Sequence, residues 1–308
     1  MKKRKVYAGE VHHVYQKTVK GGLIFYSIHD YLVFFTIFCS QAQKRGVRVL
    51  ALCPMVDHIH QVLVVDNWPQ LAEFIRAYAH LFALEWNQSR HKKGSVFRHR
   101  YGSAAKLGSK QVRTALAYCN NNPVERKLSE RAEDYRWTFL PYFENRFPYS
   151  PRFNPVCTKG YLRYVLQAVK TYAEMGNHLH YSQLERWEKR LSAQEWLQLQ
   201  DYIIAQWNII DYEEAQSYYG SFDTMLRAFH DNTGSEYDIK EDRDNYSDEV
   251  YADCTRVLLS EGHIQHVSEI PSLSDEKKDA LFHLLLQRTS ARPKQVRKYL
   301  FYALGKKD

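Results

Sequence analysis

Hydrophobic and polar residues follow two periods along the first part of the chain, and these periods separate strands from helices. Alternation is typical of a strand with one buried face, and recurrence every three or four residues is typical of an amphipathic helix. The pattern predicts strands near residues 11–19, 47–53, 60–65 and 101–107, and helices at about 29–44, 69–89 and from 110 onward. This order predicts an α+β fold, a ferredoxin-like palm with a central antiparallel sheet.

The rest of the chain favours helices. Residues 141–157 are rich in Pro, Phe, Tyr and Asn, which is typical of a linker or a wrapped connection, so we place a domain boundary near residue 150. Helical patterns at 161–174, 181–191, 193–207 and 222–230 predict an all-helical C-terminal domain over 151–308. We interpret the strongly acidic run at 236–249 as a solvated loop.

Residues 274–303 resemble a helix-turn-helix. Ser274 is a typical N-cap, apolar residues follow at helical spacing, and Pro293 is well placed to open a second helix. The second helix of such a motif enters the major groove of DNA. The residues expected to contact DNA there are Lys294, Gln295, Arg297 and Lys298. The alternative is a helical hairpin that packs on the body of the protein.

Two histidines stand two positions apart at the start of the third predicted strand. His58 and His60 flank Ile59, so both imidazoles would lie on one face of the strand while Ile59 anchors the other face in the core. Such a pair can bind one divalent ion. The alternative is a pair of polar residues on a half-exposed strand. A second copy, His178 and His180, has flanks that favour helix or loop, where the rings would diverge, so we interpret that copy as structural.

Tyr118 and Asn122 lie four positions apart on one face of a predicted helix. A tyrosine hydroxyl with an ordinary pKa near 10 is a poor nucleophile, and a nearby cation can stabilise its phenolate or polarise the phosphate that it attacks. Asn122 could supply a neutral oxygen as a third metal ligand. The chain holds 23 tyrosines, and packing is the commoner role for any one of them.

These motifs together resemble a known family. The runs His13 to Thr18, Val49 to His60 and Tyr118 to Val124 look like the single-tyrosine HUH transposases, most of all their REP-associated tyrosine transposase branch. The resemblance covers roughly residues 6 to 140. It implies His58, His60 and Asn122 as ligands of a divalent ion, Mg²⁺ or Mn²⁺, and Tyr118 as the nucleophile that forms a 5'-phosphotyrosine on single-stranded DNA. Val56 and Asp57 stand where the family usually has Pro-Asn, and Cys119 replaces a usual Ile.

The distribution of charge favours a nucleic-acid partner on the first half of the chain. Residues 1–150 hold 23 Lys and Arg against 11 Asp and Glu, whereas residues 151–308 hold 20 against 24. Cations beside aromatic rings suit contacts to the backbone and bases of single-stranded or hairpin DNA, although any one cluster could be an ordinary solvated face. The residues expected to contact DNA here are Lys2, Lys3, Arg4, Lys5, Lys92, Lys93, Arg98 and Arg100.

Several classes of protein are disfavoured. No apolar run is long enough for a membrane span or a signal peptide, and five widely spaced cysteines argue against a disulfide framework, so we expect a cytoplasmic monomer or homodimer. The function that fits best is a DNA strand transferase. Two alternatives stay open: a domesticated DNA-binding protein or repressor without turnover, and a metal-dependent phosphodiesterase in which water replaces Tyr118.

Overall fold

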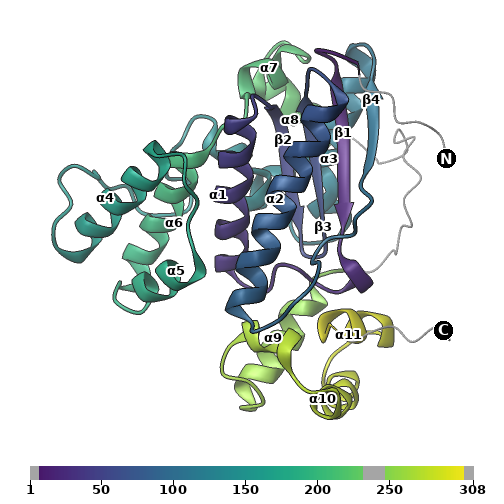
Figure 1. The fold of residues 1–308 in the computed structure, drawn as a ribbon, viewed down its shortest axis with the longest axis vertical. Coiled ribbons are helices and arrows are strands. Elements are labelled where there is room, and N and C mark those ends of the chain that lie inside the picture. The colour runs from purple at the N-terminus through teal and green to yellow at the C-terminus, as the bar shows by residue number, and fades with distance from the viewer. Residues whose placement is uncertain (1–6, 232–246, 302–308) are drawn as a thin grey trace.

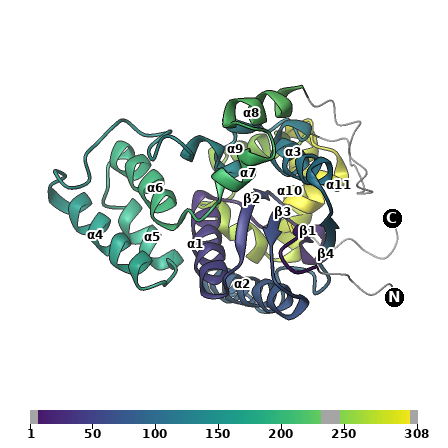
Figure 2. The ribbon, with the colours of Figure 1, turned by 90° about the horizontal axis from the view of Figure 1, so that it is seen from above.

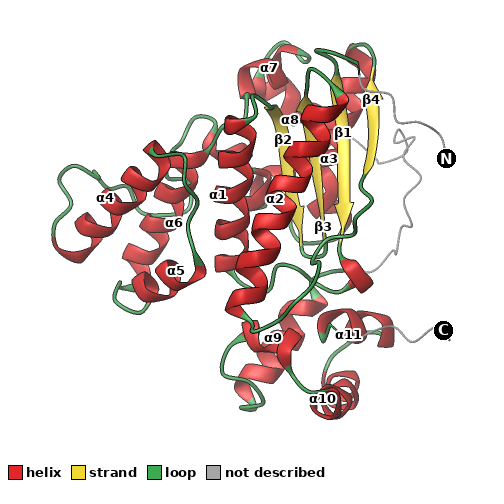
Figure 3. Cartoon of the chain, viewed as in Figure 1, coloured by secondary structure: helices red, strands yellow, loops and turns green. Residues whose placement is uncertain are grey.

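The fold is built on one sheet. The computed structural model describes residues 7–231 and 247–301. Four strands form an antiparallel sheet in the order β2-β3-β1-β4 (Figures 1 and 3). The strands are β1 Val11–Lys17, β2 Arg48–Met55, β3 His58–Val64 and β4 Gly102–Lys106. With helices between β1 and β2 and between β3 and β4, this is the α+β, ferredoxin-like arrangement that the sequence predicts.

Helices cover both faces of the sheet (Figure 2). Helices α1 (Ile28–Lys44) and α2 (Trp68–Ser89) pack on one face, where Ile59 and Leu63 of β3 point into a large apolar core. Helix α3 (Ser109–Glu125) packs on the other face, in a second core that contains Val62 and Val64. The alternation of β3 therefore sends successive side chains into two different cores.

The strand β2 differs in one detail from its predicted form. The predicted strand ends at residue 53, but Pro54 also lies within β2 and is paired with Ile59. A proline lacks the N–H that a central strand needs, and an edge strand tolerates this loss on its outer side. The edge position of β2 in the sheet accounts for the difference.

The helices after residue 150 pack on the palm at three places (Figure 1). One group packs beside α1, a second lies by α3 and β2, and a third lies below the sheet. In chain order the helices are α4 Gly160–Glu174, α5 Tyr181–Glu188, α6 Ala193–Trp207, α7 Tyr212–Ser217, α8 Phe222–His230, α9 Val250–Ser260, α10 Asp275–Arg288 and α11 Pro293–Tyr299. The described 3-10 turns are Val19–Gly21, Ala132–Asp134, Arg136–Thr138, Leu140–Tyr142 and Val267–Ser272.

The connection around residue 150 wraps closely on the helices that follow. The Tyr142 hydroxyl donates to one oxygen of the buried Asp201 carboxylate in α6, at 2.7 Å. The backbone N–H groups of Tyr149 and Ser150 donate to its other oxygen, at 3.0 and 2.8 Å. The apolar core between α1 and α6 contains residues from both sides of residue 150, so packing continues through the predicted boundary.

None of the helices in the described ranges combines the length and the apolar content that crossing a membrane requires.

Candidate active site

The face of the sheet that packs against α3 brings several polar rings together. His58 and His60 both project from β3 toward this face, while Ile59 between them enters the opposite core. On the neighbouring strand β1, Tyr15 is paired with His60 and Lys17 with His58. Residues directly opposite in an antiparallel sheet share a face. Side chains from β1 therefore lie on the same face of the sheet as the two predicted ligands.

His60 is the centre of this cluster. Its ring lies 4.8 Å from the ring of His58, 5.3 Å from that of His13 and 5.2 Å from that of Tyr118, measured between centroids. The Nδ1 atom of His60 lies 3.1 Å from Nε2 of His13, a hydrogen-bond distance. A partner on one ring nitrogen fixes the tautomer and the orientation of the ring, so His13 holds His60 in place.

Burial keeps the inner histidines neutral. Burial, assisted by the charge of Lys106, lowers the pKa of His13 to about 3. Burial also lowers the pKa of His60 well below its usual value, with the neighbouring His58, His13 and Lys17 acting in the same direction. A metal ion binds the unprotonated imidazole. These rings are therefore in the form that metal binding requires at neutral pH.

Tyr118 faces the histidines from α3. Its ring is buried and meets His60 and His13 edge to face, with centroids 5.2 and 5.5 Å away. One turn later the Asn122 side chain is also buried, and its Nδ2 donates to the Tyr118 backbone carbonyl at 2.7 Å. The sequence therefore places the tyrosine and the asparagine on the buried side of one helix, as their spacing predicts.

A chain of polar contacts links His58 to the end of α11. The Nδ1 of His58 lies 2.6 Å from Asp57 Oδ1, and Lys298 Nζ lies 2.5 Å from Asp57 Oδ2. Burial alone would raise the pKa of Asp57, but His58 and Lys298 outweigh it and hold this pKa well below its usual range. Lys298, predicted to contact DNA, thus supports a residue beside the candidate ligands.

Asp248 also lies near this chain of contacts. Its carboxyl is buried, and its Oδ2 has no hydrogen-bond partner among the described residues. Burial, with the negative charge of Asp57 added, raises the pKa of Asp248 to about 6, although Lys298 and Arg126 act against this. Asp248 belongs to the acidic run at 236–249 that the sequence suggests is solvated, and this residue is an exception; residues 236–246 lie outside the described residues.

The site suits a divalent ion held by two imidazoles and one oxygen. His58 and His60 use Nδ1 for their contacts to Asp57 and His13, so a metal would be bound through Nε2 of each ring. In the described part of the chain, no third His, Cys, Asp or Glu completes a tight cluster with this pair. The Asn122 amide oxygen is the remaining candidate from the predicted set.

The other residues predicted to contact DNA fall in several places. A groove of about 990 Å³ runs between α2 and residues 92–101, and its lining includes Lys92, Lys93, Arg98 and, from α2, Arg76. Arg100 is exposed in the same segment. Lys2, Lys3, Arg4 and Lys5 lie outside the described residues.

The predicted recognition helix is short. Helix α11 spans seven residues, and its Gln295 is buried, with Nε2 donating to the Ser247 carbonyl and Oε1 accepting from the Arg292 N–H. Gln295 is therefore not presented to a base edge. Lys294 is exposed, and Arg297 lies over the ring of Phe282 at 5.4 Å.

Sequence reasoning missed His13, Tyr15, Asp57 and Asp248. One signal was present, because His13 and Tyr15 alternate on β1 as His58 and His60 do on β3. Tyr15 needs Gly102 on the adjacent strand: a Cβ at Gly102 would come within 1.9 Å of the Tyr15 ring.

Comparison with known proteins identifies no family for this chain. The chain matches none of the protein-family profiles, and no curated protein is significantly similar to it. It is similar to a solved structure of a REP-associated tyrosine transposase bound to a REP hairpin, with 14% sequence identity and a TM-score of 0.38. The similarity covers 47% of this chain and 83% of that chain.

Proposed function

We propose that this protein cleaves and rejoins single-stranded DNA through a covalent bond to Tyr118. The observation that carries the proposal is the packing of the Tyr118 ring against His60, with centroids 5.2 Å apart, on the face of the sheet that also holds His58. The same chain supplies the tyrosine and both histidines. A monomer therefore holds the whole site, and a homodimer is not required by this geometry.

The reaction is a transfer between two oxygens. The Tyr118 hydroxyl oxygen attacks the phosphorus and loses its proton, the bond from phosphorus to the 3' oxygen breaks, and that oxygen takes up a proton. The products are a 5'-phosphotyrosine and a free 3'-hydroxyl, which can attack in the reverse direction to rejoin a strand. A Mg²⁺ or Mn²⁺ ion held by His58, His60 and Asn122 would supply polarisation of the phosphate.

The protein residues around Tyr118 have defined tasks. His13 orients His60 through the 3.1 Å contact, and Asp57 orients His58 through the 2.6 Å contact. Lys298 balances the charge of Asp57. The α3 helix and the sheet exclude water from the tyrosine ring, which protects a phosphotyrosine from hydrolysis.

The basic groove lies on the α2 side of the sheet, opposite to Tyr118, and offers a path for DNA that flanks the site. The segment 92–101 that lines it reaches the end of β1 that carries the site, since the Arg98 N–H donates to the Lys17 carbonyl at 2.9 Å and Lys17 is paired with His58. Cations along such a groove bind phosphates regardless of sequence. We assign Lys92, Lys93, Arg98 and Arg100 to the part of a single-stranded or hairpin DNA that flanks the scissile phosphate.

The decisive experiment uses labelled hairpin DNA, Mn²⁺ and a denaturing gel. The wild type should give a covalent protein-DNA band that Tyr118→Phe and His58→Ala both lose. Tyr142→Phe is the matched control, because it removes a buried hydroxyl that is bonded to Asp201 away from the site. Cleavage by Tyr118→Phe without a covalent band would instead identify a phosphodiesterase that uses water. Tight binding without cleavage of any hairpin would identify a DNA-binding protein without turnover.

A further inference from the structure

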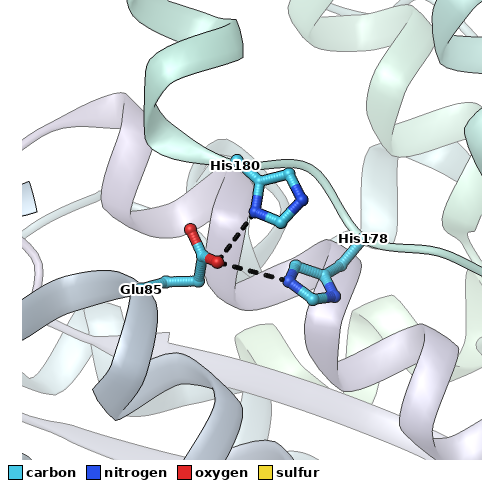
Figure 4. A group of neighbouring side chains, drawn as sticks. All are labelled: Glu85, His178 and His180. Atoms are coloured by element: carbon cyan, nitrogen blue, oxygen red, sulfur yellow. Dashed lines mark hydrogen bonds and ion pairs between the residues drawn. The ribbon is translucent and has the colours of Figure 1, made fainter. Parts of the chain in front are cut away.

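The second pair of histidines does not behave as its sequence context suggests. His178 and His180 lie in the loop before α5, and the backbone at His180 is extended, with φ −104° and ψ 152°. Leu179 between them is fully buried, so both rings point away from the core on the same side. Their centroids are 4.9 Å apart (Figure 4). The expectation that these rings diverge is therefore wrong, because extended backbone repeats the geometry of a strand.

A carboxylate from another element meets both rings. Glu85 projects from α2, and its Oε1 lies 2.8 Å from His180 Nδ1 and 3.6 Å from His178 Nε2 (Figure 4). One ligand atom from each of the three side chains lies within 4.8 Å of the others. Among the described residues, no other set of three His, Cys, Asp or Glu side chains is so close.

The two distances from Glu85 are close to those of a tetrahedral metal site. Zinc binds imidazole nitrogen and carboxylate oxygen at about 2.0–2.2 Å, so two ligand atoms in a tetrahedral shell are about 3.4 Å apart. The two distances from Glu85 Oε1, 2.8 and 3.6 Å, lie on either side of this value.

His178 provides a second observation. Its Nε2 is buried and lies 3.6 Å from Glu85 Oε1, just beyond the distance of an ordinary hydrogen bond. A buried polar atom without a hydrogen bond is costly unless another partner satisfies it. A metal ion between His178 and Glu85 would satisfy this nitrogen, and the half-exposed His180 side chain leaves room for a water ligand.

We propose that Glu85, His178 and His180 bind a transition-metal ion of the zinc type, and that this ion fastens the loop at 177–180 to α2. The ligand set of two histidines and one glutamate is one that zinc uses with a water in the fourth position. Helix α2 covers the face of the sheet opposite to α3, so this ion is separate from the ion proposed beside Tyr118. Glu85 also lines the groove assigned to DNA, but zinc binding here does not depend on the DNA chemistry.

The ion would join two parts of the fold. Besides Glu85, the loop is held by Thr36, whose hydroxyl accepts from the Leu179 N–H at 3.1 Å, and by Ser40, whose hydroxyl donates to the Asn177 carbonyl at 2.9 Å. Both partners belong to α1. The metal would add a contact to α2, so the lobe of α4, α5 and α6 would be fixed to both α1 and α2 (Figure 1).

The test measures zinc binding with the other candidate site removed. Full-length protein carrying His58→Ala and His60→Ala is stripped of metal, dialysed against zinc chloride and analysed for metal content. We expect one zinc per chain and a rise in Tm of about 5 °C at saturating zinc. Adding Glu85→Gln or His178→Gln should weaken zinc binding at least ~10-fold, because each removes a ligand.

Two controls keep the test specific. His230 pairs with Glu133 at 2.8 Å, and among the described residues no third ligand completes a cluster with this pair. His230→Ala should therefore leave zinc binding unaltered. Hydrogen exchange should slow at 177–180 when zinc is added, and only while Glu85 and His178 are intact. Absence of bound zinc, or zinc binding that survives both ligand variants, would show that Glu85 and the two histidines hold the loop by direct polar contacts alone.

Discussion

His13 of β1 and His60 of β3 stack nearly parallel, with an interplanar angle of 10° and 3.1 Å between Nε2 of His13 and Nδ1 of His60. His13 is not a proposed metal ligand, but this contact links it to His60, which is one. Removal of a partner of this kind typically weakens metal binding about 10- to 100-fold. His13→Ala should therefore weaken Mn²⁺ binding by a factor in this range, measured by calorimetric titration.

His12→Ala is the matched control for that change. His12 is the preceding residue of β1, is equally buried and faces the other way, where its Nδ1 contacts the Glu10 carbonyl at 2.8 Å. His13→Gln should restore part of the affinity, since an amide can still bond to His60. Equal losses in the His12 and His13 variants would mean that the effect comes from strand stability alone.

Gly102→Ala should act through Tyr15. The added Cβ would lie 1.9 Å from the Tyr15 ring, so the ring must move from its present position 6.4 Å from that of His60. Overpacking of this kind costs about 1–3 kcal/mol. Urea unfolding should show that cost in the wild-type background and a much smaller one with Tyr15→Ala, because the clash is then absent. A cost that is the same in both backgrounds would locate the strain elsewhere on β4.

Asp248 should make stability depend on pH. Its folded pKa of about 6 exceeds the ordinary value of 3.8, so the folded state binds the proton more tightly. The free energy of unfolding should therefore fall as the pH rises between these values, by about 3 kcal/mol in total. Asp248→Asn should remove most of this decline between pH 4 and pH 7, measured by urea unfolding. A slope unchanged by the substitution would rule out Asp248 as its source.

The ion pair between Asp30 and Arg90 should contribute strongly to stability. Both side chains are fully buried, and Arg90 Nη2 lies 2.6 Å from Asp30 Oδ1, which also accepts from the Tyr181 hydroxyl. Loss of one partner leaves the other charge buried alone, which costs about 3–5 kcal/mol. Asp30→Asn should show such a loss in urea unfolding, whereas Tyr181→Phe should cost about 1–2 kcal/mol.

The groove residues should govern the salt dependence of DNA binding. When a cation that neutralises one phosphate of a single strand is removed, the slope of log K against log salt becomes shallower by about 0.7. Lys93→Ala and Arg76→Ala should each produce such a change, measured by fluorescence anisotropy on a single-stranded oligonucleotide. Lys170→Ala in α4, where the lysine pairs with Glu174 at 3.7 Å, should leave the slope unchanged.

Periodicity was sufficient to predict the palm and the direction of its key side chains. The alternation around Ile59 placed His58 and His60 on one face, and the four-residue spacing of Tyr118 and Asn122 placed both on one side of α3, as the structure has them. These features depend on neighbouring residues and on the regular geometry of strands and helices. Local sequence therefore suffices for them.

Contacts between distant segments could not be predicted in this way. Lys298 looked like a cation on an exposed helix face, and its pairing with Asp57 arises only because α11 packs below the sheet (Figure 1). Gln295 was expected to face DNA, but the side of α11 that packs inward contains Gln295, Val296 and Tyr299. The orientation of a short helix is decided by what it packs against, and this information is not in its own sequence.

The contact of Lys298 with Asp57 also sets the order in which the parts of the site form during synthesis. During synthesis the sheet, α3 and both histidines leave the ribosome long before residue 298 does. Until then Asp57 has His58 beside it and no lysine to balance its charge. The candidate site thus reaches its described form only after α11 has been made and has folded back, so an incomplete chain carries the reactive groups without their final support.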